Sequence, residues 1–350
     1  SKMVASMAFV RAQRLGDLGL HETIHDLADE HSSTLLAEWV DEKFAPRLVE
    51  PQISIARLLS HSAGLDTHSI GAWEVGHVPT MREILMGSDD WGGQYAGGVE
   101  PTWDPGTVVE YSGGGFTVAE LALELASGDE FRDYARDEIL TPAGLHGATF
   151  DKAQPDDARI ARGCSRGSCD YGVRQTNVKA AGGLLTTVRD YAELVVALST
   201  GGLTASGARV LQPADVAQML TPVTDGQDTL KPCTSPGATA DAVSGSTIRT
   251  EVCIGGQLRR PLGYGADYYG LGVILSPVIA ADGYPRRVSH GGAQVGARAY
   301  FEIDRQTGNG FVVMINGVEV WTRSSGPLAG VDMGGQALLG AIRDAYRHTY

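Results

Sequence analysis

The chain has 350 residues and a formal net charge of −14, because 42 acidic residues outnumber 28 basic ones. An acidic surface repels phosphate groups and anionic lipids, so the composition argues against binding to nucleic acid or to a membrane surface. Hydrophobic residues make up 43% of the chain and can bury a sizeable core, and no apolar run is long enough for a membrane span.

Apolar residues at helical spacing predict a series of helices over the first two hundred residues. The first covers residues 3–15, is largely apolar and ends at Gly16, which suits a helix C-terminus. No capping residue precedes it, so we expect the chain to begin inside the fold. The other predicted helices cover 35–44, 53–60, 81–86, 116–125, 130–140 and 188–198.

From residue 268 the pattern changes to that of strands. Apolar and β-branched residues predict strands over 271–275, 297–303 and 310–315, and a closing helix over 336–347. Turn sequences at Asp282-Gly283 and Thr307–Gly310 indicate antiparallel hairpins. This order predicts an α+β fold, an antiparallel β-sheet flanked by helices with an inserted all-helical lobe. We assign residues 1–16 and 265–350 to the sheet domain, 17–200 to the helical lobe and 201–264 to a disulfide-closed insertion.

The four cysteines form two near pairs in polar, glycine-rich segments. Cys164 lies close to Cys169, and Cys233 precedes Cys253 by about twenty residues. The simplest connectivity joins each cysteine to its near neighbour. An even number of cysteines in exposed loops favours an oxidising compartment, so we expect a secreted or periplasmic protein. Four reduced thiols in a cytoplasmic enzyme are the alternative.

One short stretch fits a zinc-site pattern. His21, Glu22 and His25 match H-E-x-x-H, in which one helix face carries two histidine ligands beside a glutamate base. His31 lies at the spacing of a third ligand. The longer zinc-protease pattern needs a glycine where this chain has Ala28, and acidic neighbours indicate a solvated helix face. Zinc catalysis therefore stays an alternative, and we expect neither a metal nor a cofactor.

Six other motifs follow one another along the chain. Ser1-Lys2 before a buried helix is similar to the end of S-x-S-K, and Leu58–Leu65 to L-L-(S/T)-H-(T/S)-(S/A)-G-L. The others are Pro105-Gly106 with Tyr111-Ser112-Gly113, Pro142–Leu145, Ala181–Thr187 and His290-Gly291-Gly292. Over nearly its whole length the chain resembles the serine β-lactamase-like and penicillin-binding enzymes, which include class C β-lactamases, DD-peptidases, D-aminopeptidases and esterases. The resemblance implies their fold and acyl transfer through an acyl-serine intermediate.

The resemblance also implies the roles of particular residues. Lys2 would be the base that activates a serine one helical turn before it, and Tyr111 would carry a proton to the leaving group. His290 stands where the family often has lysine. The oxyanion would bind to the N–H of the nucleophile and to that of Ala293, on the strand that begins with His290-Gly291-Gly292.

The nucleophile itself is the first departure from the family pattern. The S-x-x-K spacing puts it three residues before Lys2, two residues upstream of Ser1, so we expect this chain to be a fragment or to work with a cleaved N-terminal polypeptide. Ser1 acting through its own α-amino group is the alternative.

The second departure is Gly113, which stands where the family has an asparagine that contacts the lysine. Its loss favours esters or a specialised acyl transfer, and Gly113-Gly114-Gly115 would leave space beside Tyr111 for a bulky substrate. We expect hydrolysis of an ester or of a D-amino-acid amide or peptide. The alternatives are an acyltransferase or peptide cyclase with the same acyl-enzyme, the zinc metalloprotease, and an inactive binding module. His61 and Ser62 are expected to be structural.

Overall fold

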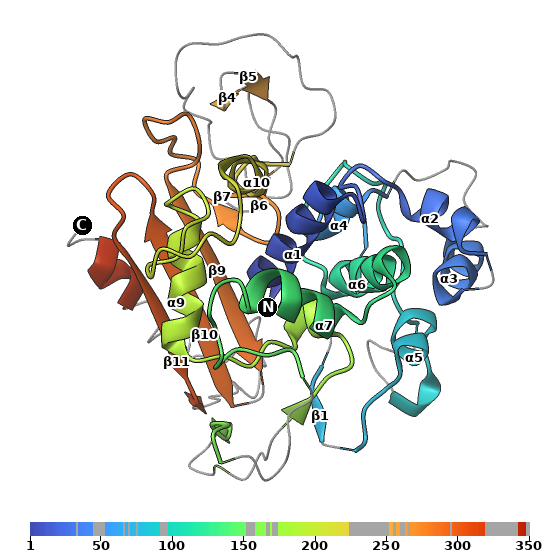
Figure 1. The fold of residues 1–350 in the computed structure, drawn as a ribbon. Coiled ribbons are helices and arrows are strands. Elements are labelled where there is room, and N and C mark those ends of the chain that lie inside the picture. The colour runs from blue at the N-terminus through green and yellow to red at the C-terminus, as the bar shows by residue number, and fades with distance from the viewer. Residues whose placement is uncertain are drawn as a thin grey trace, which may run out of the picture.

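An antiparallel sheet and a group of helices lie side by side in the computed structural model of the chain (Figure 1). The structure describes residues 1–32, 34–44, 53–65, 67–68, 71–74, 76–91, 97–151, 158–165, 169, 174–223, 252–254, 257–259, 263–264, 267–294, 296–318 and 342–347. The predicted α+β class is confirmed.

The main sheet has six strands in the order β11-β10-β9-β8-β7-β6. The strands are β6 (Gly263–Tyr264), β7 (Asp267–Tyr269), β8 (Ile274–Leu275), β9 (Arg287–Gln294), β10 (Ala297–Asp304) and β11 (Gly310–Ile315). The predicted hairpin of β10 and β11 is confirmed. The predicted strand over 271–275 is shorter in the structure, because the backbone bends at Gly272, where φ is 67. A Cβ added at Gly272 would lie only 2.6 Å from the Lys2 carbonyl oxygen. That close approach of a helix leaves only Ile274 and Leu275 to pair.

Three smaller strand pairs lie outside the main sheet. They are β1 (Trp73–Glu74) with β3 (Arg174–Gln175), β2 (Cys164–Ser165) with β12 (Gly317–Val318), and β4 (Val252–Ile254) with β5 (Gln257–Arg259). Beside β2, Cys164 and Cys169 form the predicted disulfide. Cys233, the expected partner of Cys253, lies outside the described residues, and the secreted or periplasmic location stays a prediction.

Sequence reasoning missed three helices of the described residues, over 24–30, 179–182 and 213–219, and the other helices match the predicted ranges closely. The helices are named in chain order. They are α1 (Lys2–Leu15), α2 (Ile24–Glu30), α3 (Leu35–Phe44), α4 (Ile55–Leu59), α5 (Met81–Met86), α6 (Gly113–Ser127), α7 (Phe131–Ala135), α8 (Lys179–Gly182), α9 (Val188–Ala197) and α10 (Pro213–Met219). Single turns η1 (Asp89–Trp91) and η3 (Arg136–Leu140) complete the set. As predicted, α1 ends at Gly16, whose left-handed φ of 88 favours glycine. No described helix has both the length and the apolar character to span a membrane.

Helix α1 lies in the middle of the fold and is buried over most of its length. It contacts α7, α8 and α10, and its first turn contacts Gly272, which lies between β7 and β8. Helix α9 covers one face of the sheet, where Tyr191 packs edge-on against Phe301 (Figure 1). The start of α1 is therefore held where the sheet and the helices meet.

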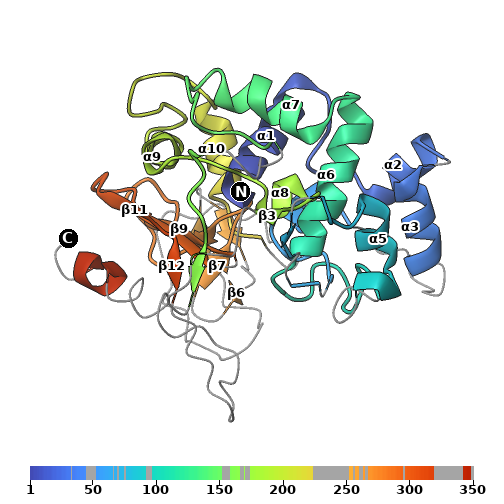
Figure 2. The ribbon, with the colours of Figure 1, turned by 90° about the horizontal axis from the view of Figure 1, so that it is seen from below.

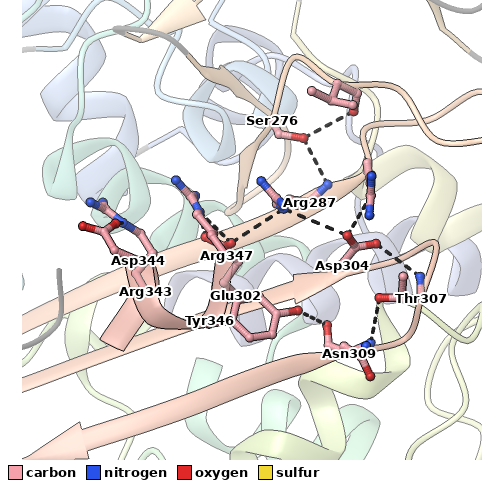
Figure 3. Close-up of polar contacts among 12 residues, drawn as sticks. Ser276, Arg287, Glu302, Asp304, Thr307, Asn309, Arg343, Asp344, Tyr346 and Arg347 are labelled. Carbon is pink, nitrogen blue, oxygen red and sulfur yellow. Dashed lines mark hydrogen bonds and ion pairs between the residues drawn. The ribbon is translucent and has the colours of Figure 1, made fainter. Parts of the chain in front are cut away.

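A polar network on the other side of β10 attaches the C-terminal helical residues 342–347 to the sheet (Figure 3). Arg347 forms two hydrogen bonds with the buried carboxylate of Glu302, at 2.9 and 2.6 Å. Tyr346 donates to the Asn309 carbonyl oxygen at 2.5 Å. These residues confirm the end of the predicted closing helix, whose residues 336–341 lie outside the described part.

Candidate active site

Lys2 lies in the first turn of α1 and is 7% exposed. Its Nζ donates to the carbonyl oxygen of Ala181 at 2.8 Å. The same atom lies 4.9 Å from the centroid of the Tyr111 ring and 5.3 Å from that of Phe116, both within the range of a cation–π contact. The sequence motif that ends at Lys2 and the motif at Tyr111 therefore meet in space.

Tyr111 is the residue before the cap of α6. The Ser112 hydroxyl accepts from the N–H of Gly115 at 3.0 Å and so begins the helix. Three imidazole rings surround the Tyr111 ring. Their centroid distances are 4.3 Å for His61, 5.0 Å for His68 and 6.0 Å for His290. We call Lys2, Tyr111, His61 and His290 the Lys2 cluster.

His290 lies on β9 and pairs with Phe301 of β10. Its Nδ1 donates to the Gly291 carbonyl oxygen at 2.5 Å, since a carbonyl can only accept. Nε2 then carries the lone pair of the neutral ring. This atom is buried and has no hydrogen-bond partner among the described residues. Burial and the charge of Lys2 lower the pKa of His290 to about 3. The ring is therefore neutral at physiological pH.

The edge of β9 offers backbone amides beside His290. The N–H of Ser276 donates to the Arg287 carbonyl oxygen at 3.0 Å, so the backbone of Arg287 faces β8. The N–H and C=O groups of successive residues in a strand point to alternate sides. Those of Gly291 and Ala293 therefore point to the same side as those of Arg287, toward the β8 edge. Pairing with β8 ends at Ser289, and Gly291 to Ala293 are exposed. Among the described strands, none covers these two amides on that side.

Two further predicted site residues are Ser1, which directly precedes Lys2, and Gly113, which follows Tyr111 by two residues. The Ser1 hydroxyl accepts from the N–H of Leu184 at 3.1 Å, two residues after α8. Gly113 is buried in the first turn of α6 and donates its N–H to the His68 carbonyl oxygen at 3.0 Å. Both positions are thus close to the Lys2 cluster in the chain, but neither joins its aromatic contacts.

The expectation of free space along Gly113-Gly114-Gly115 is wrong at two positions. A Cβ on Gly114 would lie 2.9 Å from side-chain carbons of Thr67 and Val99, and one on Gly115 would be in ordinary contact with the Leu58 carbonyl oxygen at 3.4 Å. Gly114 thus lets α6 pack closely against its neighbours.

Sequence reasoning assigned His61 only a structural part, although it contacts Tyr111. Its carbonyl oxygen accepts from the N–H of Glu110 at 2.8 Å, and its Nδ1 accepts from the N–H of Ser112 at 3.0 Å. Burial and the nearby charge of Lys2 lower the pKa of His61 well below its usual value, so the ring is neutral. Its position in the motif Leu58–Leu65 was the available signal.

Sequence reasoning missed Glu120 altogether, because it lies inside the apolar pattern of α6. Its side chain is fully buried, and Oε2 accepts from the N–H of Ala180 at 2.8 Å. Lys179 Nζ lies 3.9 Å from Oε1. Burial raises the pKa of Glu120 to about 8.

The stretch that fits the zinc pattern does not have the required geometry. Helix α2 begins at Ile24, after Thr23 caps it by accepting from the N–H of Asp26 at 3.1 Å. His21 and Glu22 precede that helix, so His21 and His25 do not share a helix face. Glu22 instead accepts from the N–H of Gly19 at 2.9 Å. Nowhere in the described residues do three histidine, cysteine or acidic side chains form a metal-binding group.

Known proteins are similar to this chain in sequence pattern and in fold. The family model described as Beta-lactamase matches residues 1–326. The penicillin binding protein from Bacillus halodurans has a TM-score of 0.57 and 18% identity, over 98% of this chain and 83% of its own. The D-amino acid amidase from Ochrobactrum anthropi SV3 has a TM-score of 0.56 and 19% identity, over 98% and 82%. At such identities the structures establish the fold alone.

A curated relative matches in sequence. The unguisins hydrolase from Aspergillus campestris (strain IBT 28561) is 26% identical over 156 residues, which are 42% of this chain and 28% of that protein. The match thus spans little more than a quarter of that relative's length.

Proposed function

The chain belongs to the Beta-lactamase family, and we propose that this β-lactamase-family hydrolase works through an acyl-serine intermediate. One observation carries the proposal. Lys2, Tyr111 and His290 are far apart in sequence, yet Lys2 Nζ and the His290 ring both lie against the Tyr111 ring. The exposed amides of β9 begin at the residue after His290. A base, a hydroxyl and oxyanion donors are the groups that acyl transfer needs.

In the proposed reaction the nucleophile is the serine that S-x-x-K spacing puts three residues before Lys2. Its hydroxyl would face Lys2, since residues three apart share a helix face. Lys2 Nζ acts as the base and takes the hydroxyl proton as the oxygen attacks the substrate carbonyl carbon. The N–H of the nucleophile and that of Ala293 bind the resulting oxyanion.

Collapse of the tetrahedral intermediate breaks the bond to the leaving group, and the Tyr111 hydroxyl gives that group its proton. Lys2 returns a proton to Tyr111, which restores both residues. Water then attacks the acyl-serine with the same groups acting in reverse, and the acid product leaves. Neutral His290 helps hold the Tyr111 ring without adding positive charge beside Lys2.

We propose an ester or a D-amino-acid amide or peptide as substrate. The D-amino acid amidase from Ochrobactrum anthropi SV3, which is similar in fold, makes a D-amino-acid amide a candidate substrate. Gly113 favours esters, because it removes the side chain that the family uses beside the lysine. Transfer of the acyl group to an amine would use the same acyl-enzyme, and product analysis with an added amine acceptor distinguishes it from hydrolysis.

Covalent labelling tests the mechanism. The full-length protein is treated with a fluorophosphonate, and intact mass and peptide mapping locate the adduct. We expect one adduct on a serine three residues before Lys2, and its loss in Lys2→Met. Lys43→Met is the matched control, because Lys43 is a 9% exposed lysine that pairs with Glu100 on the far side of α6. A folded protein without any adduct would overturn the proposal, and an adduct on Ser1 would move the nucleophile there.

A further inference from the structure

A buried carboxylate on α6 lies behind the residues that hold Lys2. Glu120 has no exposed surface on a helix whose buried positions are otherwise mostly apolar. Burying a carboxylate is unfavourable unless it makes hydrogen bonds or pairs with a charge. Its described contacts include the backbone amides of Ala180 and Lys179 and, less closely, the Lys179 ammonium. None of these groups takes part directly in the reaction proposed above, so the question is what this carboxylate does for α8.

Helix α8 has no cap of its own. Its N-cap residue is Val178, whose side chain has no oxygen, and no side-chain cap bond is present. The first amides of a helix lack partners inside it, so they need acceptors from elsewhere. Glu120 supplies the missing acceptor from another helix. Figure 2 shows α8 beside α6, close to the first residues of α1.

The same short helix carries the group that binds Lys2. Ala181 follows Ala180 directly, and its carbonyl oxygen accepts from Lys2 Nζ at 2.8 Å. Two residues after α8, the N–H of Leu184 bonds to the Ser1 hydroxyl. With Gly113 in place of an asparagine, Ala181 is the described hydrogen-bond partner of Nζ. A displacement of α8 would therefore move Lys2.

We propose that Glu120 is a positioning residue for acylation: its bond to the α8 amide sets the Ala181 carbonyl and, through it, Lys2 Nζ. This inference rests on the proposed function. What matters is an acceptor of the right length at this point, not its negative charge. A displacement of about 1 Å at a reacting group can slow a reaction about a hundredfold.

Two substitutions in the full-length protein separate length from charge. Glu120→Gln keeps an acceptor at the same reach, and we expect its fluorophosphonate labelling rate to stay within about threefold of the unmodified protein. Glu120→Asp keeps the carboxyl group but withdraws the acceptor by one methylene, and we expect labelling to slow at least about tenfold. For ester substrates the loss should appear in kcat with little change in KM, since Glu120 does not touch the substrate.

Glu124 provides the matched control. It lies one turn further along α6 and accepts from the N–H of Phe131, the first residue of α7, at 2.9 Å, rather than from an amide of α8. Glu124→Asp should therefore label at an unchanged rate. Urea unfolding of each variant shows whether a slow rate reflects loss of the fold.

The outcomes are distinct. An Asp variant as fast as the unmodified protein, or a folded Gln variant slower than the Asp variant, would overturn the role of Glu120 while leaving the mechanism intact. An unmodified protein that takes no label would overturn the proposed function, and this inference with it.

Discussion

His61 holds Tyr111 from both sides along the chain. The residue before the tyrosine, Glu110, donates its N–H to the His61 carbonyl oxygen at 2.8 Å, and the residue after it, Ser112, donates to Nδ1 at 3.0 Å. The two rings lie 4.3 Å apart. His61 makes these contacts with φ at 58, a value that L residues rarely adopt, and other described non-glycine residues avoid it. The strained backbone is thus stabilised by the contacts around it.

His61→Ala should destabilise the protein by about 2–4 kcal/mol, because it removes a buried ring and leaves the Ser112 amide without an acceptor. The labelling rate should fall as well, since Tyr111 loses its support. His61→Asn is the matched variant, because asparagine tolerates positive φ and can offer an oxygen to the amide. Urea unfolding and labelling kinetics measure both effects. An alanine variant with unchanged kinetics would show that Tyr111 does not need this support.

Tyr111→Phe separates the hydroxyl from the ring. The ring contacts with His61 and Lys2 remain, so the free energy of unfolding should change by less than about 1 kcal/mol. Hydrolysis should slow by about a hundredfold or more, as expected on losing a general acid. Steady-state ester hydrolysis beside urea unfolding tests this. A phenylalanine variant with normal turnover would remove Tyr111 from the proton-transfer path.

His290 should not shape the pH profile of the reaction. Its pKa of about 3 lies below the working range, so the ring stays neutral from about pH 5 upward. His290→Gln should lower the labelling rate through lost packing on Tyr111, while any acidic limb between pH 5 and 8 keeps its midpoint. Labelling rates measured at half-unit steps would reveal a shift. If the acidic limb of the pH profile disappears in the variant, the limb belongs to His290, and its low pKa is contradicted.

Glu120 should make stability depend on pH. Burial raises its pKa in the folded protein from 4.5 to about 8, although Lys179 opposes the shift and Glu124 adds to it. Between these values the folded state binds a proton that the unfolded state has lost, so the free energy of unfolding falls as pH rises from about 5 to 8. The slope from one such group is at most about 1.4 kcal/mol per pH unit.

Glu120→Gln removes this titration, so its unfolding free energy should vary less over the same range. Urea unfolding of both proteins at pH 5, 6.5 and 8 makes the comparison. Parallel curves for the two proteins would mean that the buried carboxyl does not titrate in this window.

Many elements of the fold could be predicted because their signals are local. The helices Leu35–Phe44 and Met81–Met86 and the strand Gly310–Ile315 have the predicted bounds. Each has a strong period, and a break or a turn marks at least one of its ends. The strand expected over 271–275 was too long, because Gly272 is bent by the approach of α1, a contact between distant segments.

The candidate site shows the same division. Lys2, Tyr111 and His290 were found because their motifs resemble those of a known family. Glu120 was not, because a single acidic residue on an apolar helix has no periodic signature, and only packing shows that an uncapped helix lies against it. The three consecutive glycines after Ser112 were interpreted as open space, whereas Gly114 is tightly packed by Thr67 and Val99.

The sequence by itself determined the longer helices, the C-terminal strands, the family resemblance and the residue types that acyl transfer requires, since these depend on neighbours along the chain. The tertiary structure decided which of those residues meet. It brought Lys2 against Ala181 and Tyr111, placed His61 around Tyr111, and separated His21 from the face of His25 by starting a helix at Ile24. Such contacts join residues up to 179 positions apart, and close packing fixes them through shapes that no local pattern records.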